Sequence, residues 1–221
     1  MGAYYSYQTI NNENEVILES YKLEKYFRFK SWDIGGLNFL ESFWQQNPLT
    51  QSLYYILKKV GKPMIVNTVC GYDDEGSFKR EIVDSWRKDI FSKITFDTKK
   101  LRNFIVDVNK NENYIKKGYI VCNEKKQYFE INYFYDDYAV VSPLALLTRN
   151  SATSQGGGDF DIKDVDFENK KDKYKFFEIN KKFDKSLITS WKDKEVRYTE
   201  NITDDIKEYE DISEKIFLKR Y

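Results

Sequence analysis

Apolar and polar positions along the chain predict more strands than helices. The β-branched and aromatic run at 3–10 is typical of a strand, and turn residues at 11–14 separate it from a second short strand at 16–18. A hairpin is expected at 119–122 and 128–133, around the polar turn 123–127. The same pattern predicts further strands at 138–141, 174–179, 196–199 and 216–218.

Two segments have helical periodicity instead. Asn47 and Pro48 form a helix start, with a capping side chain followed by proline at the first helical position. Gly61 ends this helix and Pro63 prevents its return. A near-continuous apolar strand follows at 64–70, and a second amphipathic helix is expected at about 78–91. The apolar face of the first helix comprises Leu49, Leu53, Ile56, Leu57 and Val60.

These elements predict one globular domain over residues 1–221. The chain contains only three prolines, and it shows neither a linker-like stretch nor an internal repeat. The expected fold class is α+β, a mostly antiparallel β-sheet with two principal α-helices. Aromatic residues make up 17% of the chain, so the core must be built largely from rings, with Trp191 among the expected core or interface residues.

The composition excludes several kinds of chemistry. The chain has no histidine, which removes serine and cysteine triads and histidine-containing zinc sites. Its 36 basic and 36 acidic residues cancel, so nucleic acid is not favoured as a partner. No membrane helix or secretory signal is expected. Cys70 and Cys122 each lie in an apolar run, which favours buried free thiols and a cytoplasmic location.

The strongest local signal is a glycine loop, in which Gly156, Gly157 and Gly158 precede Asp159. Successive glycine N–H groups can form a concavity that holds an anion, and Asp159 can hold a hydroxyl or a metal ion. Phosphate-binding loops, however, need a helix directly after the glycines and usually a lysine at a fixed place, and neither is present. Two interpretations stay open, a plain surface loop and a ligand-binding loop.

A second candidate follows the apolar strand at 64–70, where Gly71 precedes Tyr72, Asp73 and Asp74. The ends of strands next to glycines commonly carry ligand sites, and two carboxylates are available there. The alternative is an ordinary turn between a strand and a helix. A cysteine nucleophile at Cys70 is not expected, because no histidine can activate it.

Two acidic runs lie in the C-terminal half. The first alternates with apolar residues, which fits the solvated side of an edge strand better than a calcium loop, since the central glycine and distal glutamate of that motif are missing. The second is expected at the surface. If the two lie side by side, they present a negative patch to a basic partner. The first run comprises Asp159, Asp161, Asp164 and Asp166; the second comprises Asp204, Asp205, Glu208, Glu210, Asp211 and Glu214.

Several sequence blocks, in order from Gly36 to Trp191, together resemble a family of small proteins encoded by bacteriophages and prophages. The most specific block is Pro-Leu-Ala-Leu-Leu-Thr at 143–148, followed by Gly-Gly-Gly-Asp-Phe at 156–160. Weaker blocks are 36–44, which contains Glu41, the strand ending at 70–74, and the hairpin at 119–128. Where the family often has histidine, this chain has Ser42 and Ser142.

The resemblance implies a viral origin, and it brings no assigned activity, cofactor or partner. It gives more weight to a ligand contact at the glycine loop, because that loop is part of a recurring pattern. The leading hypothesis is a non-enzymatic accessory protein that binds a host macromolecule, for takeover or anti-defence, with no cofactor. The alternatives are a binder of a small phosphorylated ligand and a hydrolase whose divalent metal would be held by Glu41, Asp73, Asp74 and Asp159.

Overall fold

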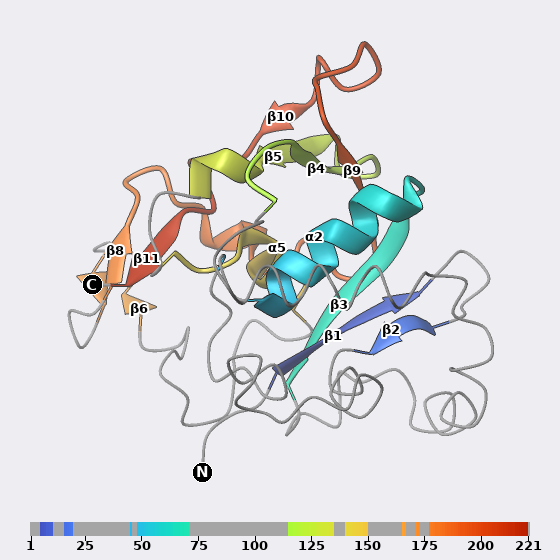
Figure 1. Ribbon diagram of the computed structural model, residues 1–221. Helices are drawn as coiled ribbons and strands as arrows, with labels where there is room; N and C mark the ends of the chain where they lie inside the picture. Colours follow the sequence, from blue (N-terminus) through green and yellow to red (C-terminus); the bar gives the residue numbers. More distant parts are fainter. Residues whose placement is uncertain are drawn as a thin grey trace.

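The computed structural model describes residues 5–10, 16–19, 45, 48–70, 115–134, 140–149, 165–166, 171–172 and 177–220. Its main element is a seven-stranded sheet in the order β10–β5–β4–β9–β3–β1–β2 (Figure 1). Among these strands, only β10 and β5 pair in parallel, and every other neighbouring pair is antiparallel. The α+β class predicted from the sequence is therefore confirmed.

The strands of this sheet come from both ends and the middle of the chain. Two small two-stranded sheets accompany it, β11 with β8 and β6 with β7. The strands of the main sheet are β1 (Tyr5–Ile10), β2 (Val16–Glu19), β3 (Met64–Cys70), β4 (Tyr119–Cys122), β5 (Gln127–Glu130), β9 (Glu195–Thr199) and β10 (Glu210–Asp211). The others are β6 (Val165–Asp166), β7 (Lys171–Asp172), β8 (Phe177–Ile179) and β11 (Leu218–Arg220).

The first predicted helix is confirmed as α2, Pro48–Val60. Leu53, Ile56 and Leu57 of its expected apolar face are buried. The Gly61 N–H donates to the Leu57 carbonyl at 3.1 Å, and Gly61 has a φ of 64°, as expected for a glycine that closes a helix. The predicted second helix at 78–91 lies outside the described residues. Within the described parts of the chain, no helix combines the length and apolar character needed to cross a membrane.

A further helix, α5 (Pro143–Leu147), was not predicted from periodicity. All five of its residues are buried, so it has no polar face whose spacing could indicate a helix. Ser142 caps it, with the Ser142 Oγ accepting from the Ala145 N–H at 3.4 Å, and proline occupies its first turn. The capping serine followed by proline was the available sequence signal.

The predicted strands at 128–133 and 138–141 need correction. The hairpin itself forms, but β5 ends at Glu130 and a 3₁₀-helix follows at Ile131–Phe134. Its partner strand β4 begins only at Tyr119, and the last bond of the ladder is Ile131 N–H to the Gly118 carbonyl at 2.9 Å. At 138–141, Val140 makes only an isolated bridge to Lys219.

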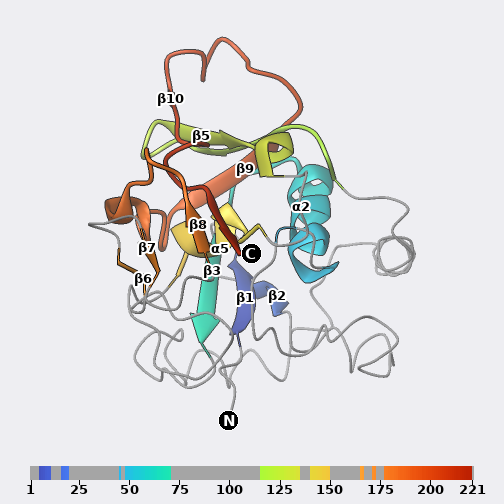
Figure 2. The same cartoon turned by 90° about the vertical axis from the view of Figure 1, so that its left-hand side faces the viewer.

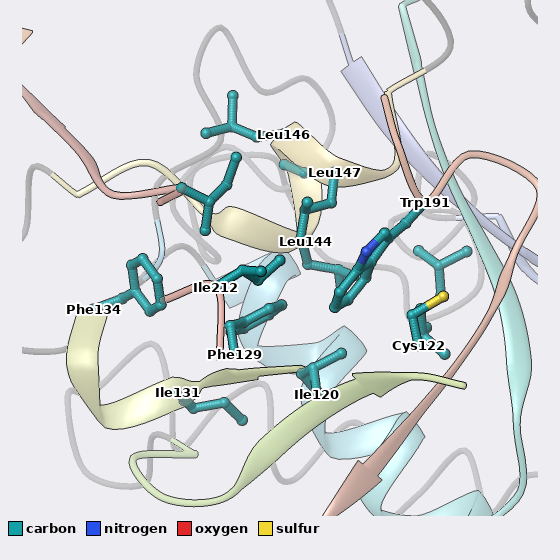
Figure 3. Packing of buried hydrophobic residues seen from close by; sticks show 14 of the residues in the cluster. Ile120, Cys122, Phe129, Ile131, Phe134, Leu144, Leu146, Leu147, Trp191 and Ile212 are labelled. Atoms are coloured by element: carbon teal, nitrogen blue, oxygen red, sulfur yellow. The ribbon is translucent and has the colours of Figure 1, made fainter. Parts of the chain in front are cut away.

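The core lies between the inner face of the sheet and the helices (Figures 1 and 2). Figure 3 shows Ile120 and Phe129 of the hairpin pointing toward Leu144 of α5 and toward Trp191. The Phe129 and Trp191 rings stack at 5.8 Å, and Trp191 is fully buried, which confirms its expected place in the core. Cys122 is a buried free thiol, also as expected, and burial raises the pKa of that thiol.

Candidate functional site

All eight candidate site residues from the sequence lie outside the described residues: Glu41, Tyr72, Asp73, Asp74, Gly156, Gly157, Gly158 and Asp159. Whether they meet in one cleft therefore stays a prediction. In the parts of the chain that the structure does describe, no group of three or more Cys, Asp, Glu or His side chains is arranged to hold a metal ion.

The structure does describe the two points from which the predicted loops depart. Thr68 of β3 forms a parallel bridge with Arg149, just after α5. The Thr68 N–H donates to the Thr148 carbonyl at 2.9 Å, and the two threonine hydroxyls are 2.9 Å apart. Because the bridged segments run in the same direction, Cys70 and Arg149 lie at the same end of the sheet. The sequences that follow them carry the two predicted loops.

This end of the sheet is held rigidly by polar contacts. Asn67 Nδ2 donates to Asp193 Oδ1 at 2.7 Å, and the backbone N–H of Asp193 donates to Asn67 Oδ1 at 3.0 Å. The Trp191 N–H donates to the Leu147 carbonyl at 2.9 Å, which ties the same turn to α5. The side chain of Arg149 is only 4% exposed. The buried Arg149 is itself the last described residue before the sequence that contains the glycine loop.

A separate cleft of about 550 Å³ opens where β4, β5 and the end of β9 meet. Its lining includes two lysines and two glutamates, so its chemistry suits a charged ligand better than an apolar one. The lining residues are Lys116, Lys117, Gly118, Tyr119, Glu130, Asn132 and Glu200.

Gly118 is the one lining position that requires glycine. Its φ is +106°, and a Cβ there would lie 2.6 Å from the ring of Tyr198. The Tyr198 hydroxyl donates to the Lys117 carbonyl at 3.0 Å, which fixes the ring against the backbone. Lys58 lies over the same ring at 5.3 Å and pairs with Glu200 at 2.7 Å. That hydrogen bond raises the pKa of Lys58 and lowers the pKa of Glu200.

Two tyrosines and two carboxylates lie together on the outer face of the hairpin. Tyr119 and Tyr128 meet edge to face, with ring centroids 5.6 Å apart. The strand register places Glu130 opposite Tyr119 and Asp211 opposite Tyr128, so all four side chains lie on the same face of the sheet. Burial, and then the nearby Glu130 and Asp211 carboxylates, raise the pKa of the Tyr119 phenol. The same three causes, with Tyr119 in addition, raise the pKa of Tyr128.

The second acidic run lies at the surface, as predicted. Between Glu200 and Glu214 the chain has seven carboxylates and one lysine. We call residues 200–214 the acidic segment. All six members of the predicted run are exposed. In both views the segment between β9 and β10 lies on the side of the hairpin away from α5 (Figures 1 and 2).

Backbone contacts and buried anchors hold the acidic segment in place. The Glu210 N–H donates to the Lys126 carbonyl and the Ile212 N–H to the Tyr128 carbonyl, both at 2.9 Å. Ile206 and Ile212 are fully buried. Ion pairs neutralise five of its seven carboxylates: Lys58 with Glu200, Arg197 with Asp205, Lys207 with Asp204, Lys215 with Glu210, and Lys182 with Glu214. Of the first acidic run, only Asp166 lies in a described element, β6, so the pairing of the two runs stays a prediction.

The polar cleft was not found from the sequence. The hairpin brings residues 130 and 132 next to residues 116–119, but Glu200 becomes their neighbour only because β9 pairs with β4. The one local signal was Gly118 directly before a strand, which marks a close backbone approach. Comparison of the chain with protein-family models, with curated proteins and with solved structures finds no match.

Proposed function

We propose that this chain is a non-enzymatic accessory protein of a bacteriophage. In this proposal it works in the cytoplasm of the host bacterial cell, where it binds a host macromolecule in takeover or anti-defence. We also propose that residues 1–221 form a single domain, which consists of a mostly antiparallel sheet with two principal helices. The sequence blocks that resemble phage and prophage proteins support the origin.

The observation that carries the binding role is the acidic segment. Seven carboxylates on a backbone fastened to the sheet edge present a fixed negative surface, so a partner need not order it on binding. The pairs of Asp204, Glu210 and Glu214 on this surface are exposed, and such pairs contribute at most about 1 kcal/mol each. A basic protein surface can therefore replace the internal cations at small cost. We propose a basic host protein as the partner. The electrostatic attraction between this protein and the acidic segment would also speed association.

Affinity capture from a lysate of susceptible bacteria tests this function. Wild type is compared with Asp204→Asn/Glu208→Gln, which removes two charges from the acidic segment, and with Glu124→Gln/Glu195→Gln, which removes two charges elsewhere. We expect a host protein that wild type and the second variant enrich and the first variant does not. The proposal would be contradicted if no host macromolecule is enriched and the purified protein instead holds a small molecule.

A second candidate function is the binding of a small phosphorylated ligand at the glycine loop. The observation that favours it is the Thr68–Arg149 bridge, which puts the departure points of both predicted loops at one end of the sheet, with the buried Arg149 at one of them. A thermal-shift screen of nucleotides tests it, since a ligand that saturates a specific site must raise stability. Stabilisation should be lost in Gly157→Val while unfolding stays cooperative. No stabilisation by any nucleotide at millimolar concentration would eliminate this candidate.

A further inference from the structure

The polar cleft has two chemically different ends. At one end Lys116 and Lys117 are exposed and directly precede β4. At the other end Tyr119 and Glu130 line the cleft, and Tyr128 and Asp211 adjoin them on the same sheet face. Lys117 and Tyr119 are two residues apart, about 6–7 Å along an extended chain. The cleft is thus short enough for one amino-acid residue to meet both ends.

We propose that the cleft binds an arginine side chain of a partner protein, with its guanidinium between Tyr119 and Glu130. The proposal rests on the proposed function, because it names a residue that the bound partner contributes. The partner's main chain would pass over the lysine end, where Lys116 and Lys117 meet its carbonyl oxygens or a neighbouring carboxylate.

The chemistry of the tyrosine end favours a guanidinium. A planar cation can lie against a tyrosine ring and form paired hydrogen bonds with a carboxylate at the same time. Glu130 is directly opposite Tyr119 in the ladder, so ring and carboxylate are adjacent without any rearrangement. The backbone of Glu130 is fixed, since its N–H donates to Ser213 Oγ at 2.9 Å. Asp211 accepts from the Ser213 N–H and hydroxyl, which holds a second carboxylate close by.

Gly118 allows the Tyr198 ring to pack directly against the backbone between Lys117 and Tyr119. A Cβ at Gly118 would lie 2.6 Å from that ring, so only glycine permits this approach, and Gly118 adds no side chain of its own to the cleft. Glu200 also lines the cleft, and it is paired with Lys58. Glu200 is thereby neutralised by an internal cation, which leaves Glu130 as the carboxylate that selects the ligand.

Titration of the isotope-labelled full-length protein with N-acetyl-arginine amide tests the site. N-acetyl-citrulline amide, which has nearly the same shape without the charge, is the matched ligand control. We expect backbone amide signals of Tyr119 and Glu130 to shift with arginine, and the dissociation constant for citrulline to be about tenfold higher or more. Glu130→Gln should weaken arginine binding about tenfold, and Glu195→Gln should leave it unchanged. Thermal unfolding of both variants shows that they are folded.

Equal binding of arginine and citrulline would overturn the proposal. So would binding that Glu130→Gln leaves unchanged, arginine-induced shifts confined to residues 204–208, or no shift at all. Each of these results is distinguishable from failure of the proposed function. Capture of a host protein that depends on Asp204 and Glu208 can succeed while the cleft binds no arginine, and the arginine test needs no host protein.

Discussion

The two faces of the β5–β4–β9 part of the sheet differ in almost every physical respect. The inner face carries Ile120, Phe129 and Val196, all fully buried in one core with α2, α5 and Trp191. The outer face carries Tyr119, Glu130 and the buried Val121, and the exposed carboxylates of the acidic segment lie on this side. Stability therefore comes mainly from one side of the sheet, while the groups able to recognise a charged partner lie on the other. Changes on the two faces should have separable effects.

The largest effect on stability is expected from Trp191 on the inner face. Its ring stacks on Phe129, and its indole N–H donates to Gln127 Oε1 at 3.0 Å. Trp191→Ala should lower the free energy of unfolding by about 3–5 kcal/mol, because it leaves a large cavity and an unpaired group. Urea unfolding measures the loss. Tyr133→Ala, at a ring that is 38% exposed, is the control and should cost much less. Equal losses would show that the core is not where we place it.

A smaller loss is expected at Gly118, where the inner face meets the cleft. Gly118→Ala must adopt a positive φ and displace the Tyr198 ring, so it should cost about 2–3 kcal/mol. Gly61→Ala provides the comparison, since Gly61 has a φ of +64°, in the left-handed helical region, and no atom within 4 Å of an added Cβ. That variant should cost only about 1 kcal/mol of backbone strain. If urea unfolding gives the same loss for both, neither the larger φ of Gly118 nor its contact with Tyr198 adds to the cost.

At the edge strand β10, Glu210 should stabilise the fold only slightly, and only above strongly acid pH. Hydrogen bonds from Lys215 and then from Gln127 lower the pKa of Glu210 below its ordinary value of 4.5. A lowered folded-state pKa means that the stabilisation is present above the unfolded value and is lost as the pH falls through the folded one. Glu210→Gln should cost about 0.5 kcal/mol near neutral pH and nothing at strongly acid pH. Urea unfolding of wild type and of Glu210→Gln across this pH range measures the difference between their free energies of unfolding. A difference that grows as the pH falls would refute the prediction.

The smallest effect on stability is expected from the acidic segment itself. Asp204→Asn/Glu208→Gln changes only exposed side chains, so the free energy of unfolding should change by no more than about 0.5 kcal/mol. Calorimetry on the variant and on wild type checks this. A loss of several kcal/mol would mean that the segment is part of the folding core rather than a separable binding surface.

The elements that could be predicted from the sequence are those with local signals. Asn47, Pro48 and Gly61 give the bounds of α2, and alternation around 123–127 gives the hairpin. The strand predicted across Ile131 failed because a strand needs a partner, and β4 begins only at Tyr119. Helix α5 was not predicted, because a helix that is buried on every side shows no hydrophobic periodicity.

The candidate site could be predicted only in part, because the contacts that form the cleft join segments far apart in the sequence. The surface position of the acidic run follows from charge alone, and the structure confirms it. The cleft depends on pairing between β4 and β9, which lie more than seventy residues apart in the sequence. Nothing near Tyr119 indicates that Glu200 will become its neighbour across the cleft. The glycine loop and the Asp73–Asp74 turn remain predictions of the sequence.

The most direct test of the account is the salt dependence of binding to the captured host protein. Dissociation constants for wild type and for Asp204→Asn/Glu208→Gln are measured over a series of salt concentrations. If the acidic segment binds through its charge, wild type binds more weakly as salt rises, because exposed charges are screened. The variant should bind more weakly at low salt and depend less on salt. Identical constants and identical slopes for the two proteins would contradict the account.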